Sequence, residues 1–328
     1  MHERNEIVPD QSASVTGDGS GNMSFATEWP LPRAALREGE HPPDSQPSEE
    51  HTTLQASKQK VPAYIARFGK ERWCQRVDRV DAGAFARDRV SVVSRAYHKM
   101  HEMFESCALP YPRRSLHLCE APGGFIQWLS NHHPNPDEWT WQAMSLTGGP
   151  SFDAPRLPTH RGRAFEGDVL DVDRWKRELS EGSFDLVTAD GATAMDHNDM
   201  EREHLSLLWA QGVVAVHCLA LEGNLLLKFF EGGLYETQVF IAMMTRMFHN
   251  VSIIKPMTSR PTNSERYLIC RRLQSRGLTR NDNLVVSSAW LKALGGVLDR
   301  LSRYQTQRLE AVFAELDGGL PAPRQGGP

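Results

Sequence analysis

Hydrophobic residues follow two alternating patterns along most of the chain. Short continuous apolar runs are typical of buried strands, and stretches with apolar residues three or four positions apart are typical of helices. We predict strands near residues 115–119, 138–146, 162–168, 184–190, 223–230, 251–256 and 266–272. We predict helices near residues 89–107, 125–132, 200–221 and 235–248. This alternation favours an α/β fold with a mainly parallel sheet and helices on both faces.

Both ends of the chain differ from this central part. Residues 1–58 are rich in Ser, Gly, Pro and acidic residues and have little apolar periodicity, so we predict a disordered acidic tail. The string GDGSGN in this tail is not preceded by a strand, which argues against a phosphate loop. We assign residues 59–275 to one globular domain and residues 276–328 to a C-terminal helical extension with a flexible end.

Charge and cysteine content narrow the class of protein. The net charge is −4, but residues 1–57 hold three basic and ten acidic residues, which leaves +3 on the remainder. A mildly basic domain of this kind is compatible with an RNA partner. The sequence contains no run of about 18 apolar residues and no secretory signal, so we expect no membrane association. We therefore interpret the five dispersed cysteines as reduced thiols of an intracellular protein.

A glycine turn and three ionisable residues stand at or near the ends of four predicted strands. The first strand runs into the glycine turn 120–124, and the third ends at Asp168. The fourth ends at Asp190, and the next carries Lys228. Ligands of open α/β sheets bind beyond the carboxyl ends of the strands, so these residues predict a site there. Each feature alone also has an ordinary structural explanation, as a turn or as a solvated rim residue.

Several longer strings together resemble the RrmJ-type (FtsJ-like) RNA ribose 2′-O-methyltransferases. They are SRAYHKMHEM, HLCEAPGGF, FDLVTADGA, NLLLKFFEG and SRPTNSERYLIC. The resemblance implies a Rossmann-like methyltransferase fold with a seven-stranded, mainly parallel sheet and S-adenosylmethionine as cofactor. It also implies a catalytic tetrad at Lys99, Asp190, Lys228 and Glu265.

Residues 70–273 are most similar to the Adrift-type branch, which methylates the second transcribed nucleotide of capped mRNA and makes cap 2. Two positions depart from related enzymes. His117 stands where bacterial ribosomal RNA enzymes have an acidic residue. Gly124 stands where animal cap 2 enzymes have alanine, a difference that we expect to be harmless.

Under this resemblance each tetrad residue has an expected role. We expect Lys228 to act as general base, because a buried lysine beside a cation gives up its proton more readily. Lys99 would be that cation, Asp190 would orient Lys228, and Glu265 would position Lys99 or the ribose. The candidate cofactor contacts are Glu120, Ala121, Pro122, Gly123, Gly124, Phe125, Trp139, Asp168 and Asp190. Trp139 is also readily explained as a core residue.

The expected partner is a capped mRNA 5′ end or another RNA, and the expected location is the nucleus, with the cytoplasm also open. Five arginines are candidate RNA contacts: Arg95, Arg113, Arg114, Arg260 and Arg266. We expect no metal, because His98, His101 and Glu102 lack zinc-ligand spacing. Two alternatives stay open, a ribosomal or transfer RNA 2′-O-methyltransferase and a catalytically silent homologue that binds RNA or a partner.

Overall fold

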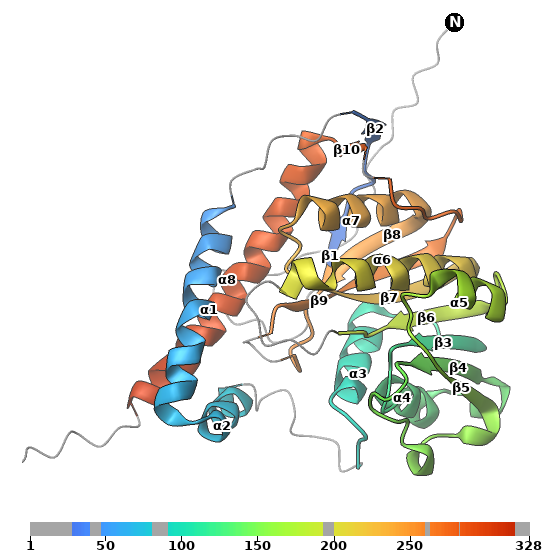
Figure 1. Ribbon diagram of the computed structural model, residues 1–328, viewed down its shortest axis with the longest axis horizontal. Coiled ribbons are helices and arrows are strands. Elements are labelled where there is room, and N and C mark those ends of the chain that lie inside the picture. Colours follow the sequence, from blue (N-terminus) through green and yellow to red (C-terminus); the bar gives the residue numbers. More distant parts are fainter. Residues whose placement is uncertain are drawn as a thin grey trace, which may run out of the picture.

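The computed structural model describes residues 28–39, 47–80, 91–192, 200–259, 263–281 and 283–318. Its centre is an eight-stranded sheet in the order β1-β8-β9-β7-β6-β3-β4-β5 (Figure 1). Strands β5, β4, β3, β6 and β7 run parallel, whereas β9 runs antiparallel to both β7 and β8. The strands are β1 (Glu28–Leu31), β3 (Arg114–Leu118), β4 (Thr140–Ser145), β5 (Gly162–Glu166), β6 (Phe184–Ala189), β7 (Leu219–Phe230), β8 (Phe248–Ile254) and β9 (Glu265–Leu273). The predicted α/β class is confirmed.

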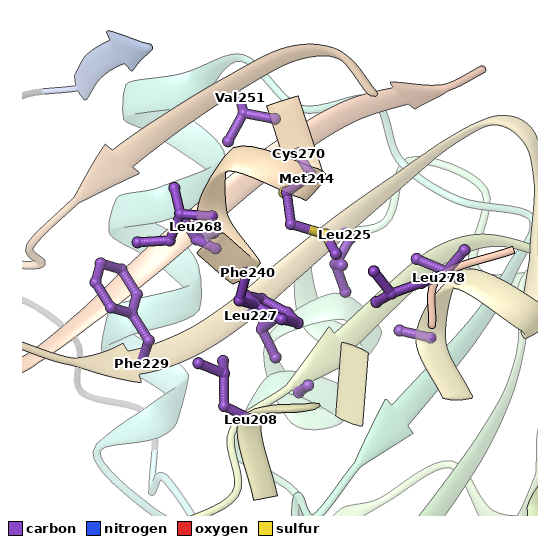
Figure 2. Close-up of a cluster of buried hydrophobic side chains, with 14 of the residues drawn as sticks. Leu208, Leu225, Leu227, Phe229, Phe240, Met244, Val251, Leu268, Cys270 and Leu278 are labelled. Atoms are coloured by element: carbon purple, nitrogen blue, oxygen red, sulfur yellow. The ribbon is translucent and has the colours of Figure 1, made fainter. Parts of the chain in front are cut away.

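Helices cover both faces of this sheet. One face packs against α5 (Val172–Glu178), α6 (Met200–Cys218) and α7 (Tyr235–Met247), and the other against α3 (Ala96–Cys107) and α4 (Gly124–His132). Central strand β7 shows why both faces are apolar. Its residues Leu225, Leu227 and Phe229 lie in the cluster beneath α6 and α7 (Figure 2), whereas Leu226 packs on the opposite side. This alternation turns Lys228 away from the cluster that contains Phe229.

Within residues 1–58 the structure describes 28–39 and 47–58, and both stretches contain regular secondary structure, so the prediction of a disordered tail over residues 1–58 is wrong for these residues. Strand β1 pairs with β8 as an eighth strand beyond the predicted seven, and β2 (Leu36–Glu38) pairs with β10 (Leu284–Val286). Trp29 is buried against the main core. The reason is tertiary, because these short elements pair with strands more than 200 residues away and need no local periodicity. Residues 1–27 and 40–46 lie outside the described part.

The two ends of the chain together form a helical layer made of α1 (Glu49–Phe68), α2 (Lys70–Val80) and α8 (Ser288–Gly318). In Figure 1, α1 and α8 lie side by side, and both also pack with α2. The first half of α8 joins the main core, while Leu309 and Phe313 of its second half pack with Leu54 and Trp73 in a small separate core. The predicted domain boundary at residue 59 therefore falls inside a helix.

Among the described residues, no helix has both the length and the apolar character needed to cross a membrane. The five cysteines are free thiols, and three of them are buried.

A half-buried ion pair should stabilise the docking of β1. The Glu28 carboxylate forms a two-pronged pair with Arg271 of β9, with 2.8 Å between Oε2 and Nη2, and it also accepts a hydrogen bond from Ser252. Loss of one partner would leave the other charge uncompensated, so we expect Glu28→Ala to lower the free energy of unfolding by about 1–3 kcal/mol. Chemical denaturation measures this change. Glu222→Ala removes an exposed pair with Arg272 and should cost less than about 0.5 kcal/mol; equal losses would contradict the argument.

Candidate active site

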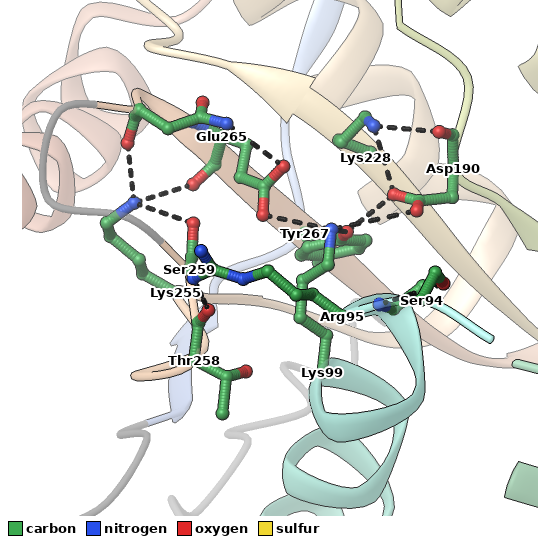
Figure 3. Close-up of polar contacts among 12 residues, drawn as sticks. Ser94, Arg95, Lys99, Asp190, Lys228, Lys255, Thr258, Ser259, Glu265 and Tyr267 are labelled. Atoms are coloured by element: carbon green, nitrogen blue, oxygen red, sulfur yellow. Dashed lines mark hydrogen bonds and ion pairs between the residues drawn. The ribbon is translucent and has the colours of Figure 1, made fainter. Parts of the chain in front are cut away.

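Four ionisable side chains meet at the carboxyl edge of the central strands (Figure 3). Lys99 lies in the first turn of α3, Asp190 directly follows β6, Lys228 lies near the end of β7, and Glu265 begins β9. The register explains how residues so far apart in the chain meet. Because β9 is antiparallel to β7, its first residue Glu265 pairs with Phe230 at the end of β7.

Asp190 connects the two lysines. Its Oδ1 lies 3.0 Å from Nζ of Lys228, and its Oδ2 lies 3.6 Å from Nζ of Lys99. Lys228 also donates a hydrogen bond to the backbone carbonyl of Asp190 at 2.7 Å. Glu265 Oε1 holds Lys99 from the other side at 3.1 Å. The four side chains are between 6% and 12% exposed, so burial strengthens these attractions and fixes their geometry.

Tyr267 belongs to this site, although the sequence analysis did not select it. Its hydroxyl donates to Asp190 Oδ1 at 2.5 Å and accepts from Lys99 Nζ at 2.9 Å. A usable signal was present, because Tyr267 stands two positions after Glu265 in a strand and therefore points to the same face.

A second group of residues holds Glu265 in place. Lys255, just after β8, donates from Nζ to the backbone carbonyls of Asn263 at 2.7 Å and Glu265 at 3.1 Å. Asn263 accepts from the Glu265 backbone N–H at 2.8 Å and donates to Glu265 Oε2 at 3.3 Å. The sequence offered little to identify these two residues, because their role depends on the path of the loop between β8 and β9.

Helix α3 also binds the loop between β8 and β9. The Glu102 carboxylate accepts hydrogen bonds from the backbone N–H groups of Met257 and Thr258, at 2.7 and 2.9 Å. Arg95 donates to the Thr258 carbonyl at 2.8 Å, so this predicted RNA contact lies beside the site and is engaged with the loop. Glu102 therefore positions the loop. In the described part of the chain, no group of three or more His, Cys, Asp or Glu side chains is arranged to hold a metal.

The buried lysines and carboxylates of this cluster shift one another's pKa values. Burial alone would lower the pKa of Lys99, but the carboxylates of Asp190 and Glu265 outweigh it and raise that pKa above its usual value. Burial raises the pKa of Glu265, yet the nearby lysines outweigh burial and lower it to about 2. Burial and the same carboxylates raise the pKa of Tyr267 well above its usual value. At neutral pH, Lys99 is therefore a cation, Glu265 an anion and Tyr267 a neutral hydroxyl.

The loop 120–124 lies beside this cluster and leads into α4. Glu120 Oε1 accepts a hydrogen bond from the Phe125 backbone N–H at 2.6 Å, whereas its Oε2 is buried without a partner among the described residues. Burial raises the pKa of Glu120 well above its usual value. Gly123 has a φ of 110°, a left-handed conformation that favours glycine. Ala121 and Pro122 are partly exposed, whereas the Phe125 side chain is fully buried and cannot border a ligand as predicted.

The neighbouring strand ends complete the edge. Asp168 follows β5 and is exposed, with one carboxylate oxygen accepting from the Leu170 backbone N–H at 2.9 Å. Leu146 follows β4, and Leu146 and Leu170 are 56% and 51% exposed. An exposed carboxylate and exposed apolar side chains at neighbouring strand ends suit a ligand with a flat ring and polar edges.

Trp139 lies in the core and not at the predicted cofactor site. It precedes β4, so it lies at the amino end of the strand, and it is fully buried. Its indole N–H donates to Ser115, which also bonds His117, and His117 in turn bonds Thr188. Burial lowers the pKa of His117 to about 3, so this departure from the bacterial enzymes is a neutral core histidine. Trp139 is thus a core residue and cannot contact the cofactor.

Three of the predicted RNA-binding arginines do not face the candidate active site. Arg113 and Arg114 stand at the amino end of β3, where Arg114 lines a cavity of about 360 Å³ on the opposite edge from the tetrad. Arg266 is only 1% exposed and lies inside the protein. Arg260 lies outside the described residues. Sequence distance alone could not reveal which end of a strand, or which face, each arginine would occupy.

Gly124 is more constrained than the sequence suggested. A Cβ atom at this position would meet Ser94 Oγ at 2.4 Å and the Tyr97 backbone nitrogen at 2.8 Å, at the start of α3. Glycine in place of alanine therefore allows the close approach of α4 to the start of α3 in this chain. We expect Gly124→Ala to lower the free energy of unfolding by about 1–3 kcal/mol through overpacking, measured by chemical denaturation. Gly295→Ala, in α8 with open space around it, should instead stabilise by about 0.5–1 kcal/mol. Equal changes in stability for the two variants would contradict the overpacking at Gly124.

Acid should weaken the buried cluster. Because the pKa of Glu265 is about 2 in the folded protein and its ordinary value is 4.5, the unfolded state binds more protons between these values. The free energy of unfolding should therefore fall as the pH drops from about 4.5 to about 2, by on the order of 1–3 kcal/mol from this residue. Denaturation across this range should show a flatter profile for Glu265→Gln. Exposed Glu310→Gln should keep the wild-type slope, and an equally steep profile in Glu265→Gln would refute the assignment.

Comparisons with known proteins identify relatives of this chain. The chain is 32% identical over 198 residues to the mouse protein named cap-specific mRNA (nucleoside-2′-O-)-methyltransferase 2, covering 53% of this chain and 25% of that protein. Its Drosophila melanogaster namesake is 30% identical over 245 residues, covering 62% and 34%. The chain thus spans about a quarter to a third of the length of these relatives. The family described as FtsJ-like methyltransferase matches residues 92–273, more than half of the sequence and all of the tetrad. The chain therefore belongs to the FtsJ-like methyltransferase family.

Proposed function

We propose that this chain transfers the methyl group of S-adenosylmethionine to a ribose 2′-hydroxyl of RNA. We propose the second transcribed nucleotide of capped mRNA as its substrate. One observation carries the proposal: Asp190 contacts both Lys99 and Lys228 at the edge of the sheet that also presents the glycine loop 120–124. The names of the mouse and Drosophila relatives support capped mRNA, and nuclear residence follows from that substrate, with a cytoplasmic pool also compatible.

The groups at this edge fit the methyl donor. The backbone at Gly123 and the start of α4 offer close approach and N–H groups to its polar end. Leu146 and Leu170 offer apolar surface to a purine, and Asp168 can accept hydrogen bonds from an amine or a ribose hydroxyl. When bound, S-adenosylmethionine would supply a methyl group on a positively charged sulfur, and the neutral thioether that remains after transfer is a good leaving group.

The protein must then align the hydroxyl and receive its proton. Lys228 is the proposed general base, acting in its neutral amine form, and its Nζ takes the proton as the ribose O–H bond breaks. Asp190 orients this amine through both its carboxylate and its backbone carbonyl. Lys99 remains an ammonium held by Glu265 and Tyr267, so it supplies positive charge where the ribose oxygen becomes negative.

Lys228→Ala tests the proposal directly. Transfer from labelled S-adenosylmethionine should mark the second ribose of capped RNA in the wild type and should fall by roughly 10²- to 10⁴-fold in the variant. Binding of S-adenosylhomocysteine, measured by calorimetry, should stay within about twofold, because the donor loop is intact. Lys176→Ala removes an exposed lysine of α5 and should leave both readouts unchanged.

Other outcomes would redirect the proposal. Label on uncapped structured RNA would identify a ribosomal or transfer RNA methyltransferase. Tight donor binding with no label on any RNA would instead favour a catalytically silent homologue that binds RNA or a partner. Full activity in Lys228→Ala would remove the proposed base.

A further inference from the structure

Arg266 follows Glu265 in β9, but its side chain points to the opposite face of the sheet. The β7–β9 register pairs Lys228 with Tyr267 and Phe230 with Glu265, all on the face of the active site. Arg266 pairs with Phe229 on the other face, and only 1% of it is exposed. A buried arginine directly behind the active site requires an explanation, because its desolvation is costly.

The guanidinium of Arg266 joins three parts of the structure. Its Nη1 donates to the backbone carbonyl of Glu231, three residues after Lys228 at the end of β7. Its Nη2 donates to Ser302 Oγ of α8 at 3.3 Å. Burial lowers the pKa of Arg266 to about 10, so it remains a cation at neutral pH. Its Nε has no partner in the described part of the chain, a cost that a residue serving stability alone would not need.

Helix α1 holds Glu231 from the other side. Gln55 donates to the Glu231 carboxylate at 2.6 Å, Lys58 forms an ion pair with it, and His51 Nε2 lies 3.9 Å away. This carboxylate is only 6% exposed. Although burial alone would raise the pKa of Glu231, Lys58 and Arg266 outweigh it and keep the residue ionised. The end of β7 is thus fixed between α1 and Arg266.

Helix α8 also contacts the loop that leads into β9. Gln305 donates to Ser264 Oγ at 3.3 Å, directly before Glu265, and the Tyr304 hydroxyl lies 3.0 Å from Met257 Sδ. Both α1 and α8 lie outside residues 92–273, which match the family. Segments from the two ends of this chain therefore support the strand ends that carry Lys228 and Glu265.

We infer that Arg266 is a positioning residue for methyl transfer: by joining the end of β7, the start of β9 and helix α8, it sets the spacing between Lys228 and Glu265. The inference rests on the proposed function, since it assigns these two residues to the reacting site. It makes the helical layer of α1, α2 and α8 part of the catalytic apparatus. Small errors in the placement of reacting groups reduce rates strongly, so removal of the link should act on turnover before it acts on donor binding.

Three substitutions of graded severity test the inference in the full chain. Ser302→Ala removes one acceptor, Arg266→Lys keeps the charge but not the fork, and Arg266→Met removes both. We expect kcat on the methylated RNA to fall about fivefold, about tenfold and at least a hundredfold in that order. Binding of S-adenosylhomocysteine should stay within twofold, and the KM for RNA within threefold. The matched control is Arg303→Met, which removes an exposed arginine of α8 paired with Glu50 and should change kcat by less than twofold.

Two results would overturn the inference. The first is an unchanged kcat in Arg266→Met. The second is a parallel loss of kcat, donor binding and Tm in all three variants, with no partial recovery in Arg266→Lys, which would make Arg266 purely structural.

A readout that needs no activity separates this inference from the proposed function. The side-chain ¹³C NMR signals of Lys99 and Lys228 should shift with Ser302→Ala and not with Arg303→Met. If the wild type methylates no RNA, the proposed function fails, while these signals still decide whether α8 sets the geometry of the site. Signals unchanged in Ser302→Ala and Arg266→Lys would reject the positioning role.

Discussion

The candidate active site depends on one carboxylate, that of Asp190, which two buried lysines share. Lysine side chains buried so close together lose most of their hydration, which only opposite charge and hydrogen bonds can offset. Asp190 provides both, with 3.0 Å to Lys228 and 3.6 Å to Lys99, and Glu265 adds a second anion at 3.1 Å from Lys99. Loss of Asp190 or Glu265 would leave the buried Lys99 ammonium without one of its two anions, so these side chains are held as a unit.

The topology of the sheet makes this unit possible. In a sheet of parallel strands, the first residue of a strand lies at the edge opposite the carboxyl ends. Glu265 is the first residue of β9, yet it reaches the carboxyl edge because β9 runs antiparallel to β7. Tyr267 follows on the same face and bonds Asp190 and Lys99. The reversed strand therefore explains how a late segment of the chain completes a site begun by α3.

Support for the site comes in layers from both faces of the sheet. On one face, Glu102 of α3 binds the backbone of the β8–β9 loop. Behind β9, Arg266 binds Glu231 and Ser302, which ties the strand ends to α8. The donor loop is packed just as closely, since Gly124 touches the start of α3. Helices that lie far apart in the chain thus restrict the same few side chains, which suits a reaction that depends on alignment.

The sequence by itself determined the alternation of strands and helices, the carboxyl-edge position of Asp168, Asp190 and Lys228, and the motif that includes Glu265. These features are local, because hydrophobic periodicity and short motifs report on neighbouring residues. Tertiary structure alone decided the rest. Trp29 and β1 became ordered through pairing with β8, Trp139 and Arg266 turned into the interior, and Lys255, Asn263 and Tyr267 joined the site. Strand register, the direction of β9 and the packing of α8 set these contacts, and they depend on residues up to hundreds of positions apart.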